Sequence, residues 1–183
     1  MIEIRWHGRG GQGAKTGSQI LAEAAFSMGK YVQAFPEYGS ERTGAPMKAF
    51  TRIDNDPILI HSAIENPDVI VIIDDTLVDI EAVKEGLKKG VKVLVNSEKS
   101  KEEIQKYFPD SDLFLVPATK ISMETLGANF PNTPVLGAIA KITGTVTLDA
   151  LIDSFKEKME KKFGEDIINK NISSIKRGFE EVH

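Results

Sequence analysis

The sequence predicts an α/β fold: a mostly parallel, Rossmann-like open sheet with flanking helices and a helical C-terminal part. Two observations carry this prediction. Short apolar runs typical of strands alternate with longer amphipathic stretches typical of helices. A glycine-rich turn joins the first strand-like run directly to the first helix-like stretch, as in doubly wound α/β proteins. At 183 residues, the chain is expected to form a single domain spanning 1–183.

The N-terminal part of the chain is expected to contain the glycine turn and a hairpin. Asp54-Asn55-Asp56-Pro57 is rich in turn-forming residues, so the apolar runs on its two sides are expected to pair. The expected elements here are a strand at 2–6, a helix at 18–28, a strand at 31–35, a loop at 36–46 and hairpin strands at 47–53 and 58–61.

The rest of the chain continues the alternation and ends in helices. The run Val-Ile-Val-Ile-Ile within 68–74 has no polar interruption, which is typical of a central strand buried on both faces. Pro134 is expected at the first helical position of the helix that follows the turn at 129–134. The expected strands are 68–74, 91–95 and 113–116, and the expected helices are 79–89, 101–108, 135–142, 148–163 and 167–182.

Composition excludes several kinds of chemistry. The chain has no cysteine, so it forms no disulfide and supplies no thiolate for catalysis or for an iron–sulfur cluster. Its three histidines are far apart in sequence and make no metal-spaced pair. The net charge of −4 gives no sign of a nucleic-acid surface, and no apolar run has the length of a membrane span. We therefore expect a cytoplasmic protein that meets neither nucleic acid nor membrane.

The glycine-rich turn is the first candidate site. Gly8, Gly10 and Gly13 match G-x-G-x-x-G between a strand and a helix. Glycines let backbone N–H groups approach an anion, and the N-terminus of the following helix adds a positive dipole end. His7 directly precedes the glycines, where it is placed to contact a ligand or partner. The candidate ligand-binding residues are Gly8, Arg9, Gly10, Gly11, Gln12, Gly13 and Lys15.

Two nucleotide-binding motifs fit this turn only in part. A P-loop requires lysine directly after the last glycine, but Ala14 intervenes and turns Lys15 by about 100° around the helix. A dinucleotide site needs an acidic residue after the second strand. Glu37 lies at about that distance, although Pro36 precedes it and a polar loop follows. A free-standing nucleotide-binding protein and a glycine turn that serves only packing both remain alternatives.

A second candidate site follows the second expected strand. The segment 36–46 concentrates carboxylates, an arginine, a tyrosine and a serine on one loop. Ligands of open α/β sheets collect at the carboxyl ends of strands, so this loop and the glycine turn are expected to lie side by side. Asp74 and Asp75 end another strand, where they would line the same crevice or cap the next helix. The candidate residues of the loop are Glu37, Tyr38, Ser40, Glu41 and Arg42.

The two motifs together resemble the gamma subunit of 2-oxoacid:ferredoxin oxidoreductases. The resemblance rests on Gly-Arg-Gly-Gly-Gln-Gly at 8–13 and Pro-Glu-Tyr-Gly-Ser-Glu-Arg-Thr-Gly-Ala-Pro at 36–46. It spans essentially the whole chain, including the turn at 129–134 and the helix expected after it. Thr43-Gly44-Ala45-Pro46 is similar to the form found in pyruvate and branched-chain oxoacid enzymes, with the pyruvate enzyme the nearer match. A 2-oxoisovalerate enzyme is the alternative within the family.

The resemblance implies a multisubunit, oxygen-sensitive enzyme. Such enzymes convert pyruvate, coenzyme A and oxidised ferredoxin to acetyl-CoA, CO₂ and reduced ferredoxin. Thiamine diphosphate and [4Fe–4S] clusters belong to the alpha, beta and delta subunits, and ferredoxin meets the complex through them. The gamma chain, inactive alone, is associated with coenzyme A access. The glycine turn, with Arg9 and Lys15, would hold coenzyme A phosphates, and the 36–46 loop would dock on the thiamine-bearing subunits and help to close the active site.

Overall fold

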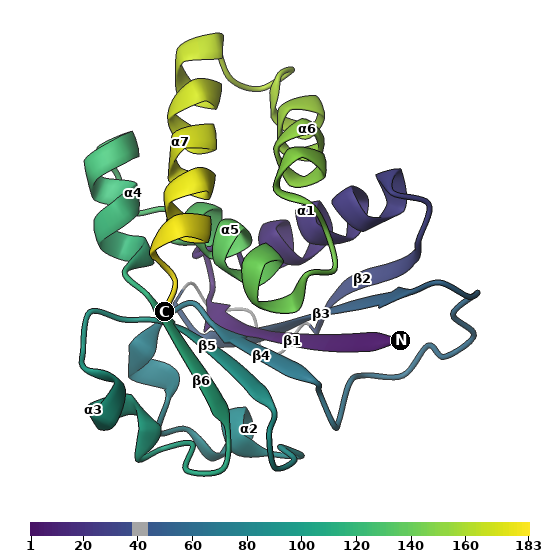
Figure 1. Ribbon diagram of the computed structural model, residues 1–183, viewed down its shortest axis with the longest axis vertical. Helices are drawn as coiled ribbons and strands as arrows, with labels where there is room; N and C mark the ends of the chain where they lie inside the picture. The colour runs from purple at the N-terminus through teal and green to yellow at the C-terminus, as the bar shows by residue number, and fades with distance from the viewer. Residues whose placement is uncertain (38–43) are drawn as a thin grey trace.

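The computed structural model describes residues 1–37 and 44–183, and its described strands form one mixed six-stranded sheet (Figure 1). The strand order is β2-β3-β1-β4-β5-β6. The neighbours β1, β4, β5 and β6 run parallel, whereas β3 is antiparallel to both β1 and β2. The strands are β1 (Ile2–Arg9), β2 (Tyr31–Glu37), β3 (Pro46–Asp54), β4 (Val69–Ile72), β5 (Lys92–Asn96) and β6 (Asp112–Val116).

Helices cover both faces of this sheet. Figure 1 shows α1 and α4 to α7 above the sheet, with α2 and α3 below it. The chain therefore changes face between β1, which leads into α1 above, and β4, which leads into a 3₁₀ turn η1 and α2 below. The helical elements are α1 (Ala14–Ser27), η1 (Asp75–Leu77), α2 (Glu81–Lys84), α3 (Lys101–Gln105), α4 (Ala118–Leu126), α5 (Asn132–Thr143), α6 (Leu148–Met159) and α7 (Glu165–Glu181).

The buried run predicted near residue 70 is the centre of the sheet. Val69 and Val71 of β4 pack into the core above, and Ile70 and Ile72 pack into the core below. All four side chains are almost fully buried, which explains why the run carries no polar residue. The two cores thus share β4, and the α/β fold predicted from the sequence is confirmed.

Close contact of backbones holds α7 on α5. A Cβ atom on Gly178 of α7 would lie 1.9 Å from the Pro134 carbonyl oxygen, and one on Gly137 of α5 would lie 1.9 Å from the Ile175 carbonyl oxygen. Only glycine allows helices to approach so closely. The chain then ends against the sheet, where the His183 backbone exchanges hydrogen bonds of 2.9 and 3.1 Å with Leu115 of β6.

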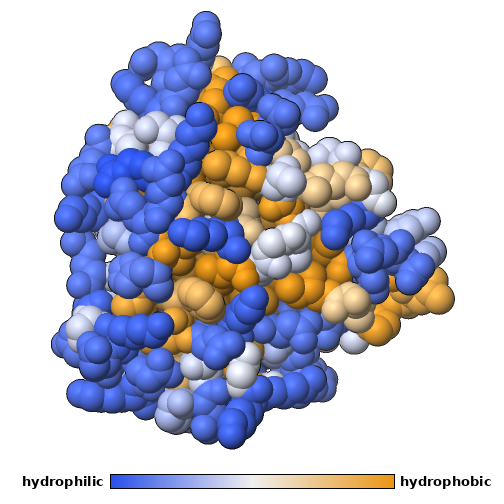
Figure 2. Space-filling model, in the orientation of Figure 1, coloured by the Kyte–Doolittle hydropathy of each residue, from blue (hydrophilic) through white to orange (hydrophobic). Residues whose placement is uncertain are grey.

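The upper core reaches the surface between the helices. Partly buried apolar residues of α5, α6 and α7 pack against it, and Figure 2 shows an apolar strip on this face with polar surface on both sides. No helix in the described part of the chain is long and apolar enough to cross a membrane.

Three local predictions were wrong. The segment 58–61 was expected to pair with β3 but forms no strand. Both edges of β3 are already paired, one with β1 and the other with β2. The helix expected at 79–89 is reduced to η1 and the four-residue α2. The α5 helix begins at Asn132, two residues before Pro134. In addition, α4 was not predicted at all.

Candidate functional site

The glycine turn connects β1 to α1 with two residues in the left-handed region. Gly11 has φ +94° and Gly13 has φ +83°, values that residues with a side chain rarely adopt. Gly13 is also the N-cap of α1, and a Cβ there would lie 2.6 Å from Cγ of Asn132, the first residue of α5. The turn therefore favours glycine for two reasons: the left-handed backbone at Gly11 and Gly13, and the close approach of α5 to Gly13.

Gln12 makes two hydrogen bonds to the Arg9 backbone across the turn. Its backbone N–H donates to the Arg9 carbonyl at 3.0 Å, while its side-chain Oε1 accepts from the Arg9 N–H at 2.7 Å. The Arg9 N–H is therefore already satisfied by the turn's own side chain. A ligand at this turn would meet the remaining N–H groups near the start of α1, where Lys15 lies exposed in the first helical turn.

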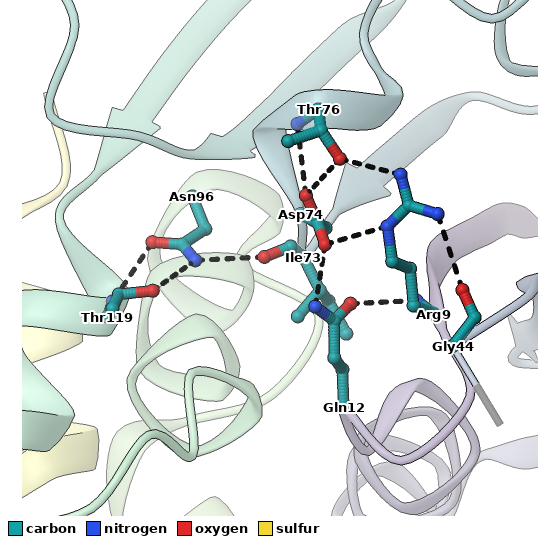
Figure 3. Close-up of polar contacts among 8 residues, drawn as sticks. All are labelled: Arg9, Gln12, Gly44, Ile73, Asp74, Thr76, Asn96 and Thr119. Carbon is teal, nitrogen blue, oxygen red and sulfur yellow. Dashed lines mark hydrogen bonds and ion pairs between the residues drawn. The ribbon is translucent and has the colours of Figure 1, made fainter.

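Arg9 and Gln12 both meet Asp74, the residue that follows β4 by two positions (Figure 3). Asp74 Oδ2 lies 3.1 Å from Arg9 Nε and 2.7 Å from Gln12 Nε2. Asp74 Oδ1 accepts from Thr76 N at 3.0 Å and from Thr76 Oγ1 at 2.6 Å. Arg9 further donates from Nη2 to Thr76 Oγ1 at 2.8 Å. This group of four residues, Arg9, Gln12, Asp74 and Thr76, is called the Asp74 network below.

These hydrogen bonds also set the charge state of Asp74. Partial burial raises the pKa of its carboxyl, but hydrogen bonds from Thr76 and Gln12 and the charge of Arg9 outweigh that effect. The pKa of Asp74 is consequently held below its ordinary value, and the carboxylate stays ionised at neutral pH. The positive charge of Arg9 is thus paired within the chain.

The base of the second loop lies beside the glycine turn, as expected. The N–H of Gly10 donates to the Ala45 carbonyl at 2.9 Å, and Arg9 Nη1 donates to the Gly44 carbonyl at 3.3 Å. Glu37 ends β2, with its carboxylate 3.9 Å from Nζ of Lys48. The other predicted residues of this loop, Tyr38, Ser40, Glu41 and Arg42, lie outside the described residues.

A polar cleft of about 490 Å³ opens on the other side of the Asp74 network. It lies at the carboxyl ends of β4 and β5, where open α/β sheets bind ligands. Asn96 ties its walls together: Nδ2 donates to the Ile73 carbonyl at 2.8 Å and to Thr119 Oγ1 at 2.9 Å, and Oδ1 accepts from Thr119 N at 3.0 Å (Figure 3). The lining residues are Gln12, Ile73, Asp74, Asp75, Asn96, Ser97, Glu98, Lys99, Thr119, Asn129 and Pro131.

Charges in the cleft are mixed. Lys99 Nζ lies 3.0 Å from Asp75 Oδ2, which also accepts from Ser97 Oγ at 3.0 Å. Asp75 therefore holds Lys99 and Ser97 at the cleft, whereas the cap of η1 is Asp74. Across residues 1–37 and 44–183, no three His, Cys, Asp or Glu side chains come together to bind a metal ion.

His7, expected from its position to contact a ligand or partner, makes a buried contact within the chain. It is 3% exposed on the lower face of β1, beside Arg5, whose Nε donates to His7 Nε2 at 3.0 Å. Burial, together with the charges of Arg5 and Lys48, lowers the pKa of His7 to about 3. His7 is thus a neutral acceptor for a buried arginine, and it organises the face opposite α1.

Several residues of the site were not predicted. Thr76, Asn96, Thr119 and Asn132 each complete a contact between segments that are distant in sequence. One signal was available: Asn96 directly ends a buried strand at the carboxyl edge of the sheet. The partner choice of Arg9 had no such signal, because 65 residues separate it from Asp74.

The chain is an α/β protein whose glycine turn, Asp74 network and polar cleft lie together at the carboxyl edge of the sheet. Comparison with known proteins gives its family. The chain belongs to the pyruvate ferredoxin/flavodoxin oxidoreductase family, which it matches over residues 3–181.

Among its relatives, pyruvate synthase subunit PorC of Thermotoga maritima is 50% identical over 99% of this chain and 94% of the relative. The pyruvate/ketoisovalerate oxidoreductases common subunit gamma of Thermococcus kodakarensis is also 50% identical, over 100% of this chain and 97% of the relative. The crystal structure of pyruvate oxidoreductase subunit PORC from Thermotoga maritima superposes with a TM-score of 0.89, at 48% identity, covering 100% of this chain and 97% of that one.

Proposed function

We propose that this chain is the gamma subunit of a multisubunit pyruvate:ferredoxin oxidoreductase. The enzyme would convert pyruvate, coenzyme A and oxidised ferredoxin to acetyl-CoA, CO₂ and reduced ferredoxin. The observation that carries the proposal is the 50% identity, over nearly the whole of both chains, to a pyruvate synthase subunit. The family assignment favours such a subunit over a free-standing nucleotide-binding protein.

The second candidate is the gamma subunit of a 2-oxoisovalerate enzyme, and one relative favours a subunit that serves both oxoacids. The Thermococcus kodakarensis chain, equally 50% identical, is a common subunit of pyruvate and ketoisovalerate oxidoreductases. We therefore propose that the partner subunits determine which oxoacid the enzyme uses. In this proposal the gamma chain serves a step that both oxoacids share.

The redox cofactors belong to the partners in this proposal. Thiamine diphosphate and [4Fe–4S] clusters would be held by the alpha, beta and delta subunits, through which ferredoxin is reduced. The support is compositional, because clusters are held by cysteine thiolates and this chain has none. The cytoplasmic location stays a prediction.

The gamma chain would contribute the glycine turn to coenzyme A access. The N–H groups at the start of α1 and the cationic side chains of Arg9 and Lys15 would face the phosphates. Within residues 1–37 and 44–183, three of the five Arg9 N–H donors are paired, and the other two would be directed to a phosphate. The loop containing Glu37, Tyr38, Ser40, Glu41 and Arg42 would dock on the thiamine-bearing subunits and help to close the active site.

Substitution of Arg9 tests the coenzyme A assignment. In the complex reconstituted with its partner subunits, Arg9→Ala should raise the KM for coenzyme A about tenfold, because a charged hydrogen bond is worth roughly 1.5–3 kcal/mol. Pyruvate decarboxylation without coenzyme A should be unchanged. The control is Arg177→Ala, which removes an arginine of α7 that pairs with Glu124 of α4 and with Glu181 of α7. An unchanged KM in Arg9→Ala would overturn the coenzyme A assignment and leave the subunit assignment intact.

A further inference from the structure

We propose that Asp74 is a positioning residue for the coenzyme A-dependent step. It would fix Arg9 and Gln12 of the glycine turn, and through Arg9 the backbone at Gly44, without itself contacting the ligand. This inference rests on the proposed function of the glycine turn and assigns a role to a carboxylate outside it.

Asp74 stands where three separate segments meet. It follows β4, which pairs in parallel with β1, so the chain changes face of the sheet at this point. The glycine turn after β1 reaches it through Arg9 and Gln12, and the Gly44 backbone before β3 reaches it through Arg9 (Figure 3). A single carboxylate therefore links side chains and backbone that follow or precede three neighbouring strands of the sheet, beyond the contacts that the strand pairing itself makes.

Capping of η1 uses only one of the two carboxylate oxygens of Asp74. Its Oδ1 accepts from the N–H and the hydroxyl of Thr76, which is a local cap. Its Oδ2 instead accepts from Gln12 and Arg9, at 2.7 and 3.1 Å. A cap alone would not need the second oxygen, so the contacts to the glycine turn are a separate task.

The number of hydrogen bonds to the Asp74 carboxylate indicates that Asp74 acts through its neighbours. An ionised carboxylate offers about four lone-pair positions, and four donors meet it here. No acceptor capacity is left for a ligand. The Arg9 guanidinium, by contrast, is held by Asp74, Thr76 and Gly44, and among the residues that the structure describes two of its five N–H donors have no partner. Asp74 thus orients the group that would meet the phosphate.

Asp74→Asn is the sharpest perturbation, because it keeps the size of the side chain. One carboxylate oxygen becomes an amide NH₂, which accepts no hydrogen bond, so Arg9 and Gln12 lose a shared acceptor. In the reconstituted complex, we expect the KM for coenzyme A to rise about tenfold, the scale of a small misplacement of a binding group. The rate of pyruvate decarboxylation without coenzyme A should stay unchanged.

Two further variants make the test decisive. Asp68→Asn is the matched control, since Asp68 precedes the same strand at its other end and accepts from the Glu3 N–H at 2.8 Å. It should leave the KM within about twofold, as expected for a surface change. Thr76→Val removes only the hydroxyl between Asp74 and Arg9 and should raise the KM about threefold, which keeps the inference testable if Asp74→Asn does not fold.

The double variant Arg9→Ala/Asp74→Asn separates positioning from independent binding. If Asp74 acts through Arg9, the double variant should be little worse than Arg9→Ala alone. Multiplied effects would overturn the positioning role. A raised KM in Arg9→Ala with a normal KM in both Asp74→Asn and Thr76→Val would overturn this inference and leave the proposed function standing. A normal KM in all of them would overturn this inference and the coenzyme A assignment of the glycine turn, and would leave the subunit assignment intact.

Discussion

Gly13 is the residue whose replacement tests the geometry of the site most sharply. Alanine at this position meets two penalties. The first is the left-handed backbone at φ +83°, which costs a residue with a Cβ roughly 1–2 kcal/mol. The second is steric, because the new Cβ would lie 2.6 Å from Cγ and 2.7 Å from Nδ2 of Asn132. Overpacking of this kind costs roughly 1–3 kcal/mol, and since Asn132 is a side chain that can turn away, the lower end applies.

Gly13→Ala should therefore lower the free energy of unfolding by about 2–3 kcal/mol. The matched control is Gly11→Ala in the same turn, with φ +94° and no heavy atom within 4 Å of the added Cβ. It carries the backbone penalty alone, about 1–2 kcal/mol. Urea denaturation of the isolated chain, followed by circular dichroism, gives both values.

The difference between the two variants isolates the contact with α5. The double variant Gly13→Ala/Asn132→Ala should recover most of that difference, since Cγ and Nδ2 are then gone. Equal destabilisation in Gly13→Ala and Gly11→Ala would refute the close approach of α5 to the turn. A stability of Gly11→Ala equal to that of the unmodified chain would refute the left-handed backbone.

Two other predictions concern stability. The pKa of His7 is about 3 in the fold and near 6.5 when unfolded, so only the unfolded chain gains a proton between these values and stability falls as pH drops from 6.5 toward 3, by up to about 1.4 kcal/mol per pH unit. His7→Gln, which keeps an acceptor for Arg5, should reduce the stability lost between pH 6.5 and 4.5 by about 2 kcal/mol, as measured by urea midpoints; an equal loss in both proteins would contradict the buried neutral histidine. Gly178→Ala, whose Cβ would lie 1.9 Å from the Pro134 carbonyl oxygen, should cost about 2 kcal/mol in the same assay. Gly164→Ala, at the N-cap of α7 where the added Cβ meets open space, should cost no more than about 1 kcal/mol, and equal stabilities of the two variants would argue against the α5–α7 contact.

Local patterns predicted the parts of the fold that depend on local physics. The apolar run in β4 and the amphipathic α7 were recognisable because burial on two faces or on one leaves a clear period. The pairing of β3 was not, since Asp54-Asn55-Asp56-Pro57 predicts a turn but does not name the partner strand. The α4 helix was missed because Thr119, Ser122 and Thr125 are weak helix formers and its burial comes from α5 and α7.

The same division applies to the site. The carboxyl-edge rule for α/β sheets predicted that the glycine turn and the second loop would be neighbours, and contacts at Gly10 and Arg9 confirm it. Arg9 and Lys15 were expected to make the glycine turn positively charged, whereas the fold pairs the charge of Arg9 with Asp74. His7 was placed near the ligand because of its position before the glycines, but alternation along β1 puts it with Arg5 on the opposite face from Trp6. Such pairings depend on tertiary contacts and have no sequence period.

The most direct test of the proposed subunit is to omit this chain and add it back. The partner subunits alone, supplied with pyruvate, coenzyme A and ferredoxin, should reduce ferredoxin slowly or not at all, and addition of the purified chain should restore the rate in proportion to its amount up to saturation. The chain itself should be colourless and inactive. Full activity of the partners without it, with no change on its addition, would contradict the account.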